Sequence, residues 1–457
     1  MIRTLLALAL VSSPVIAEDW PTYAHDNRRS HTTGETLKLP LEPAWTYRSP
    51  QLPQTAWTGP ARWDAYAGND GLQSMRNFDP AYFVTAVGDR VYFGSSADNA
   101  AHCLDAASGE ELWVTFTDSA VRLPPTIAGG RAYFGSDDGY AYCTDAGSGE
   151  LLWRFSPAPG ARRIPSNTKL VSPWPIRTGI LVEDDHAYFA ASLFPWEKSY
   201  LCAVDAGSGE TEFVAEEQNL TLQGALLLSP EKLYAPQGRA SPIVFARDSG
   251  SRIGTVPGTG GVFCILTEDE QLIAMPQNQK SRDSVTKIAS IPGTDRSAVL
   301  SITGTERLVV AGARAYFHQS GELVAIDRHL AAEAQTALAT TPGKIKALKK
   351  RLGAGLPPDE SASVQAEIKA LEAAVPAWKN QAEASELWKQ KLPVPSALIV
   401  AGPHIIVGGD HMVSIIDSQT GKPLWSAPTE GRVYGLVAAN GRLFASTDRG
   451  HIHAFAP

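Results

Sequence analysis

Short stretches in which apolar and polar residues alternate recur along most of this chain, each bounded by turn residues. The pattern is clearest in VYFGSSADNAAHCLDAASGEELW at 91–113 and RAYFGSDDGYAYCTDAGSGELLW at 131–153. Each copy reads as a strand, a Gly/Ser/Asp turn, a second strand ending at an Asp, a Ser-Gly-Glu turn and a strand that carries a Trp. Alternation with a period of two, broken by such turns, predicts β-hairpins. The spacing of about forty residues predicts stacked supersecondary units.

The repeat returns with lower fidelity at 180–213, 225–254, 262–300, 307–327, 397–425 and 433–457, which makes eight units with the last one strand short. The segment around Trp45 resembles a fourth strand and stands before the first unit. Pairing that strand into the last sheet would remove an open edge. The sequence therefore predicts an all-β fold, an eight-bladed β-propeller closed by an N-terminal strand. Seven blades are the alternative if 262–300 is irregular.

One segment breaks the strand pattern. Residues 329–391 are rich in Ala, Glu, Lys and Leu, and a Pro-Pro-Asp-Glu-Ser turn divides them. This composition predicts an α-helical hairpin inserted between the third and fourth strands of blade six, with Trp388 resuming the repeat. Apolar residues at i, i+3 and i+4 form one stripe from Ile345 to Leu352 and another from Val364 to Val375. These stripes either pack against each other or bind a partner.

The first residues predict export. Residues 1–17 combine an early Arg3, an apolar run and a small residue at Ala17, which is typical of a cleaved signal peptide with the mature chain starting at Glu18. Residues 18–457 then form the propeller. The position after the cleavage site is not Cys, so no lipid anchor is expected there. We expect a periplasmic or secreted protein without a membrane span.

Composition narrows the chemistry. The net charge of −8 argues against nucleic-acid binding, which needs a basic face. The four cysteines are too few for a disulfide scaffold and include no CxxC motif. His451 and His453 alternate on one predicted strand without an identifiable third ligand. The sequence predicts no metal site and no catalytic set.

Propeller topology places the long segments 48–81 and 154–178 on one face, around the mouth of a central channel, and the helical hairpin on the other. Loops over a rigid scaffold commonly carry function. Aromatic, amide and charged side chains on that first face are the candidate ligand-binding residues: Trp57, Arg62, Trp63, Asp64, Asp79, Arg122, Arg163, Arg177, Gln223, Arg239 and Arg432. Such a set can grip a polar ring or an anion. Alternatively, the arginines pin the loops by binding backbone carbonyls and nearby Asp residues.

The repeat resembles the PQQ-like β-propeller repeat, which quinoprotein alcohol dehydrogenases share with the assembly factors of outer-membrane barrels. The segments RRIPSNTKLVSPWPIRTGILV and LYAPQGRASPIVFARDSG also resemble exported bacterial proteins described as PQQ-binding-like. For a quinoprotein, the resemblance implies an adjacent Cys-Cys pair over the quinone and a calcium site. This sequence has no adjacent cysteines, so bound PQQ with calcium is not expected.

Two functions follow as hypotheses. The first is a non-catalytic envelope scaffold that binds a protein or polymer, with the hairpin 329–391 as a contact arm. The second is a protein that uses the loop face, either as a PQQ-dependent dehydrogenase or as a carbohydrate- or anion-binding receptor. The absence of a recognisable catalytic set favours the first.

Overall fold

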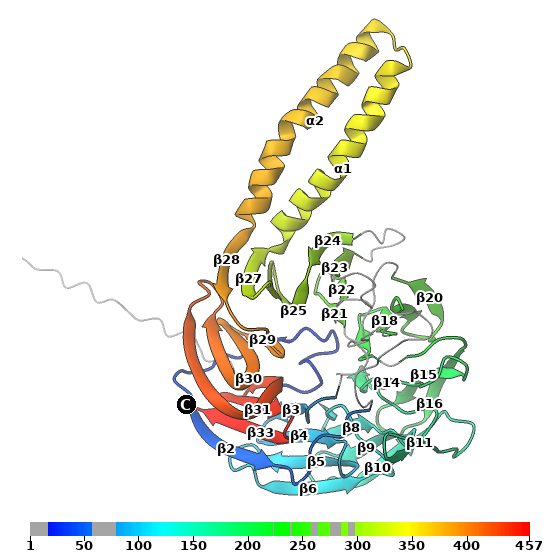
Figure 1. Ribbon diagram of the computed structural model, residues 1–457. Helices are drawn as coiled ribbons and strands as arrows, with labels where there is room; N and C mark the ends of the chain where they lie inside the picture. Colours follow the sequence, from blue (N-terminus) through cyan, green and yellow to red (C-terminus); the bar gives the residue numbers. More distant parts are fainter. Residues whose placement is uncertain are drawn as a thin grey trace, which may run out of the picture.

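The chain folds into small antiparallel sheets arranged side by side, as the computed structural model shows (Figure 1). It describes residues 17–56, 79–222, 224–237, 240–256, 264–274, 285–290 and 298–457. Six four-stranded sheets follow one another along the chain. The first three are β3 (Val84–Val87), β4 (Arg90–Ser95), β5 (Ala100–Asp105) and β6 (Glu111–Phe116); β7 (Thr126–Ala128), β8 (Arg131–Gly135), β9 (Ala141–Asp145) and β10 (Leu151–Phe155); and β13 (Leu181–Glu183), β14 (His186–Ala191), β15 (Ser199–Asp205) and β16 (Thr211–Glu217).

The next three sheets keep the same strand order. They are β17 (Leu227–Leu228), β18 (Lys232–Ala235), β19 (Ile243–Ala246) and β20 (Arg252–Thr255); β21 (Cys264–Leu266), β22 (Gln271–Ala274), β23 (Val285–Ser290) and β24 (Ala298–Thr303); and β25 (Thr305–Ala311), β26 (Arg314–Gln319), β27 (Glu322–Asp327) and β28 (Glu386–Lys391). A two-stranded hairpin, β11 (Ile164–Ser166) and β12 (Lys169–Val171), lies in the loop after β10. This arrangement is a β-propeller.

The last two repeat units share one seven-stranded sheet. Its order is β1 (Thr32–Thr33), β29 (Ala397–Ala401), β30 (His404–Asp417), β31 (Pro423–Ala439), β32 (Arg442–Thr447), β33 (His451–Ala456) and β2 (Glu42–Arg48). The long strands β30 and β31 each cover two strand positions of the repeat. Strand β2 pairs antiparallel with β33, with Trp45 opposite Ala454. The N-terminal strand thus lies where the missing strand of the final unit is expected.

The repeated Trp links several of the neighbouring sheets. The indole Nε1 of Trp113 donates to the carbonyl of Ala146 at 3.1 Å, and that of Trp153 donates to Ala206 at 3.0 Å. Gly149 has a φ of +74°, and a Cβ there would lie 2.7 Å from the Trp113 ring. Gly is therefore required twice over, for its conformation and for the close approach of the indole. The Trp of one sheet therefore packs on, and donates to, the Asp and Ser-Gly turn of the next sheet.

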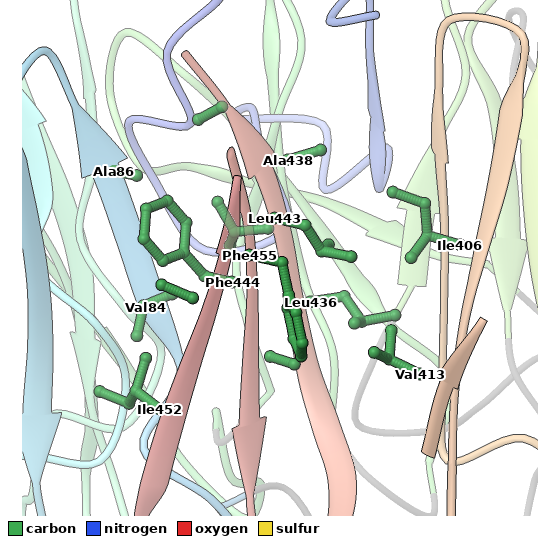
Figure 2. Close-up of a cluster of buried hydrophobic side chains, with 14 of the residues drawn as sticks. Val84, Ala86, Ile406, Val413, Leu436, Ala438, Leu443, Phe444, Ile452 and Phe455 are labelled. Carbon is green, nitrogen blue, oxygen red and sulfur yellow. The ribbon is translucent and has the colours of Figure 1, made fainter. Parts of the chain in front are cut away.

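The largest apolar core joins the two ends of the propeller sequence. Val84 of β3 packs near Phe444 of β32 and Ile452 of β33, and all three are at most 4% exposed (Figure 2). On the far side of β31, Ile406 and Val413 of β30 continue the same cluster. Burial of such side chains contributes roughly 1.5–3 kcal/mol each, so the contact between the first and last sheets is a substantial part of the stability.

Two helices stand away from the sheets as an arm (Figure 1). Helices α1 (Arg328–Gly353) and α2 (Pro358–Ala384) connect β27 to β28, and residues 386–391 return to the sheet as a strand. The Asp327 carboxylate caps α1 by accepting from the amides of His329 and Leu330 at 3.0 Å. The two apolar stripes pack on each other around Leu348, Val364 and Ile368. Among the described residues, no helix is long and apolar enough to cross a membrane.

Candidate functional site

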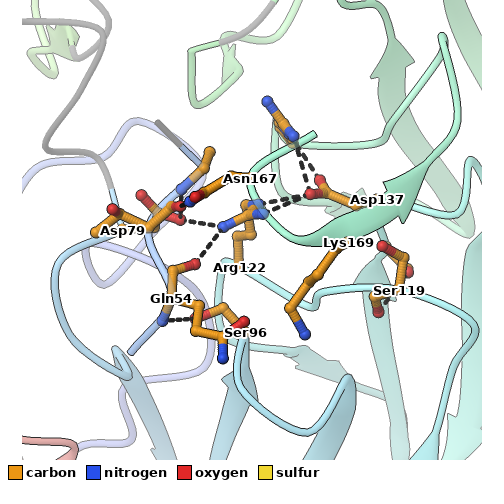
Figure 3. A network of polar contacts seen from close by, with 12 residues as sticks. Gln54, Asp79, Ser96, Ser119, Arg122, Asp137, Asn167 and Lys169 are labelled. Carbon is orange, nitrogen blue, oxygen red and sulfur yellow. Dashed lines mark hydrogen bonds and ion pairs between the residues drawn. The ribbon is translucent and has the colours of Figure 1, made fainter. Parts of the chain in front are cut away.

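Three of the predicted site residues meet in one buried polar cluster on the loop face (Figure 3). Arg122 precedes β7, Arg177 precedes β13, and Asp79 precedes β3. Between them lies Asp137, from the β8–β9 turn. We call these four residues the loop-face network. Each is at most 6% exposed, so the network belongs to the interior beneath the loops.

Asp137 is the centre of the network. Arg177 Nε donates to its Oδ1 at 2.6 Å and Arg177 Nη2 to its Oδ2 at 2.9 Å, a bidentate pair. Arg122 Nε also donates to Asp137 Oδ2, at 2.7 Å. Arg122 Nη1 reaches the carboxylate of Asp79 and the carbonyl of Gln54, the latter at 2.9 Å. Two guanidinium groups and two carboxylates therefore share one desolvated site.

The pKa values follow from this arrangement. Burial by itself would raise the pKa of Asp137, but the charges of Arg122 and Arg177 outweigh burial and lower it to about 2. At Asp79 burial prevails over the attraction of Arg122, so its pKa is raised. Asp137 thus stays ionised at neutral pH. The arrangement holds two positive and two acidic groups in fixed contact beneath the loops.

The network fixes the loops around it. Asp79 Oδ2 accepts the Ala56 amide at 2.9 Å, which holds the segment after β2. Asn167 Nδ2, in the β11–β12 turn, donates to the Thr55 carbonyl at 2.5 Å, and Lys169 Nζ, from the first residue of β12, donates to the Ala97 carbonyl at 3.0 Å. Each contact joins segments more than 20 residues apart. The guanidinium groups therefore bind loop backbone and Asp side chains, the arrangement that the sequence left open as an alternative to ligand binding.

The other candidate residues lie elsewhere or outside the described ranges. Arg163 has a side chain 25% exposed, with Asp118 at 3.9 Å. Arg432, in β31, is 46% exposed and lies 3.5 Å from Asp410. Neither contacts the network. Six candidates fall outside the described residues: Trp57, Arg62, Trp63, Asp64, Gln223 and Arg239.

The opposite end of the propeller holds a feature that the sequence did not reveal. Residues 18–37, which we call the plug, run inside the arrangement of sheets and bind their innermost strands (Figure 1). Backbone hydrogen bonds join Trp20 to Ala86 of β3, Pro21 to Ile127 of β7, and Asn27 to Leu228 of β17. Further along, Arg28 binds Leu266 of β21 and His31 binds Val400 of β29. The plug therefore bridges sheets from both halves of the chain.

Buried side chains support the plug's tight path. Arg29 is 1% exposed; its Nε donates to the Leu226 carbonyl at 3.0 Å and its Nη1 to the Tyr23 carbonyl at 2.7 Å. Ala24, His25, Arg29 and His31 all have positive φ, between 56° and 83°. Such conformations cost free energy in non-Gly residues and persist where surrounding contacts over-determine them.

A cavity of about 850 Å³ lies between the plug and the sheets. Two arginines, Arg28 and Arg247, belong to its lining. The carboxylates of the lining are more numerous: Glu18, Asp19, Asp26, Glu183, Asp184, Glu268 and Glu270. Arg247 is itself paired with Glu183 at 2.9 Å and Asp184 at 2.8 Å. The excess of negative charge disfavours an anionic ligand at this end of the channel.

Comparison with known proteins identifies the repeat. The profile of the family described as "Outer membrane protein assembly factor BamB" matches residues 55–172 and 370–457, on either side of the less regular units and the start of the arm. These matches support a PQQ-like propeller family for the chain. A search of curated proteins finds no match.

Solved structures resemble this PQQ-like propeller at low identity. The computationally designed Ika8 protein aligns with 83% of this chain and 97% of its own, at 10% identity and a TM-score of 0.55. BamB from Moraxella catarrhalis aligns with 91% and 100%, at 14% identity and 0.39, and a europium-containing methanol dehydrogenase with 96% and 98%, at 11% identity and 0.49. Identities this low concern the fold and not the activity.

The described residues of this PQQ-like propeller do not fit a quinoprotein cofactor site. Cys103, Cys143, Cys202 and Cys264 lie on separate strands as free, buried thiols, and burial raises the pKa of each. No group of three His, Cys, Asp or Glu side chains in the described ranges is placed to hold a metal ion.

Proposed function

We propose that this PQQ-like propeller is an exported, non-catalytic binding protein whose helical arm contacts an envelope protein. In this proposal residues 1–17 are a cleaved signal peptide, the sheets form eight blades in a closed ring, and the mature protein is periplasmic or secreted. The observation that carries it is the arm itself, which packs on its own apolar seam and stands clear of the sheets (Figure 1).

Hydrogen bonds and an ion pair hold the base of the arm. Gln335 of α1 makes two hydrogen bonds with the backbone of Ser301 in β24, accepting at 2.6 Å and donating at 2.9 Å. Arg328 donates to the carboxylate of Asp269 and to the carbonyl of Gly312, both at 2.8 Å. An arm tied to two sheets keeps a fixed direction, which lowers the entropic cost of binding a partner.

The far end of α1 is strongly basic. Lys344, Lys346, Lys350 and Arg351, which we call the basic tip, are exposed. Part of this charge stabilises the C-terminal end of α1, since cations there interact favourably with the helix dipole. Four exposed cations on one projecting end also suit a partner with an acidic surface. We therefore assign the basic tip to the contact with an acidic envelope protein.

Capture from an envelope extract tests this assignment. The tip variant combines Lys344→Glu, Lys346→Glu, Lys350→Glu and Arg351→Glu. The matched control, Lys369→Glu with Lys379→Glu, reverses exposed charges on α2 of the same arm. We expect the wild type and the control to recover the same partner, and the tip variant to recover at least about 10-fold less because complementary charge becomes like charge.

Folding must be intact in both variants, so the free energy of unfolding is measured alongside. Reversal at the helix end should cost about 1 kcal/mol or less. Equal recovery by the tip variant would contradict the assignment. Recovery of an envelope polymer instead of a protein would contradict the partner class, and stoichiometric PQQ uptake by the purified protein would contradict the non-catalytic function.

A further inference from the structure

Glu35, at the inner end of the plug, is a fully buried carboxylate without a cation. It is 0% exposed. Its Oε2 accepts the backbone N–H of Glu18 at 2.8 Å, and its Oε1 accepts the N–H of Gly441 at 3.1 Å. No Lys, Arg or His among the described residues forms an ion pair with it. A buried carboxylate is costly unless a positive charge or several hydrogen bonds compensate it.

Other carboxylates add to the negative charge around the nitrogen of Glu18. The Glu18 side chain accepts from the Thr33 hydroxyl at 2.6 Å and from the Gly34 amide at 2.5 Å. Asp19 accepts from the Gly88 amide at 2.8 Å. The nearest potential cation, His25, lies 3.5 Å from Glu18, and burial lowers its pKa, so it is neutral at pH 7. The Glu18 nitrogen therefore binds the Glu35 carboxylate in a part of the chain where Glu18 and Asp19 add negative charge.

We propose that Glu35 is the binding site for the α-amino group of the mature chain. Hydrolysis of the Ala17–Glu18 peptide bond consumes one water, leaves a carboxylate on Ala17 and turns the Glu18 nitrogen into an ammonium group. That nitrogen already lies 2.8 Å from Glu35, so cleavage creates an ion pair without moving either group. An α-ammonium, with an ordinary pKa near 8, is charged at neutral pH.

The ion pair would tie the plug to the last sheet. The backbone N–H of Asn440 donates to the Glu18 carbonyl at 3.2 Å, and the N–H of Gly441, in the same β31–β32 turn, donates to Glu35. The contacts of the Glu18 side chain do not depend on cleavage, so they position the nitrogen in the precursor. Removal of the leader then adds the charge. This inference rests on the export proposed above, and it makes the stability of the propeller depend on processing.

The test compares two forms of the chain from Glu18 to Pro457, one with a free α-amino group and one acetylated at Glu18. The melting temperature (Tm) and the rate of proteolysis within residues 18–37 are measured for both. We expect the free form to melt about 3 °C or more higher and to be cleaved more slowly. In Glu35→Gln the difference between the two forms should vanish. In Glu42→Gln, a control at an exposed position of β2, it should persist.

Three results would overturn the proposal. Equal Tm of the free and acetylated forms, or a difference that survives Glu35→Gln, would show that no ion pair forms. An exported protein whose first residue is not Glu18, determined by mass spectrometry, would remove the ammonium group from the site. Only the mass-spectrometric result bears on the cleavage site. None of these results alters the expectation for the basic tip, so failure of this proposal is distinguishable from failure of the proposed function.

Discussion

The two ends of the propeller are held through different chemistry. At the loop face, two arginines and two aspartates form one buried ionic cluster with Asp137 at its centre. At the opposite end, backbone hydrogen bonds to several sheets hold the plug. At the loop face, a few charged side chains supply most of the contacts, whereas the contacts of the plug are distributed over many residues. Loss of one side chain should therefore matter more at the loop face.

Removal of the central charge is expected to have the largest effect. Asp137→Asn leaves the guanidinium groups of Arg122 and Arg177 buried without their shared carboxylate, and should lower the free energy of unfolding by about 3–5 kcal/mol. Arg177→Ala should cost a similar amount, since it strands Asp137 from its bidentate partner. Urea unfolding measures both. A change below about 1 kcal/mol in either variant would mean that water replaces the lost partner. The buried ionic cluster would then contribute little to the stability of the loop face.

Substitution within the plug should have a smaller effect. Arg29→Met removes the buried donors to the Leu226 and Tyr23 carbonyls, at an expected cost of about 2–3 kcal/mol. Arg28→Met is the control, because the Arg28 side chain is 40% exposed and lies 3.7 Å from its partner Glu268. Hydrogen exchange at the amides of Leu228 and Leu266, which bind the plug, reports whether the loss is local. An Arg29→Met protein as stable as Arg28→Met would refute this account.

Acid should affect His31 of the plug and Asp137 of the loop-face network in different pH windows. Burial lowers the pKa of His31 in the plug to about 4, below its ordinary value of 6.5, so the unfolded chain binds the proton first. This residue's contribution is present above pH 6.5 and is lost as the pH falls toward 4. The depressed pKa of Asp137, about 2, makes its contribution fall only below about pH 4.

The free energy of unfolding, measured against pH, checks this order. His31→Phe should reduce the loss of unfolding free energy between pH 6.5 and 4 by about 1–2 kcal/mol. This is less than the full value for such a pKa shift, because the side chain is only partly shielded from water. The same variant should leave the loss below pH 4 unchanged. Identical slopes for the wild type and His31→Phe would show that the imidazole is not held in its neutral form.

The smallest effect is expected at Arg163, which sequence reasoning grouped with Arg177. Its side chain is partly exposed and its pairing distance to Asp118 is 3.9 Å, so Arg163→Ala should change the free energy of unfolding by less than about 0.5 kcal/mol. Comparison with Arg177→Ala under the same conditions isolates the effect of burial. A loss as large as that of Arg177→Ala would mean that Arg163 also pins the loop.

Local signals in the sequence were sufficient to predict the repeating unit. Period-two alternation predicts the strands, Asp and Ser-Gly predict the turn, and the Trp that follows marks the fourth strand, because each signal acts within about forty residues. The strand containing Trp45 could be predicted for the same reason, since it repeats the pattern of the other fourth strands. Its pairing with β33, more than 400 residues away, shows that a local pattern can specify a distant contact when the repeat supplies the template.

Tertiary structure alone decided what closes each end. In the sequence, Asp137 belongs to the Gly/Ser/Asp turn of its repeat. It stands where the preceding copy has Ser96, and this difference between the copies was the available signal of its role. Its partners lie 15 and 40 residues away in loops of irregular pattern. The plug has no repeat and no periodicity. Its path is set by the unpaired backbone groups of the innermost strands, which exist only once the sheets have come together.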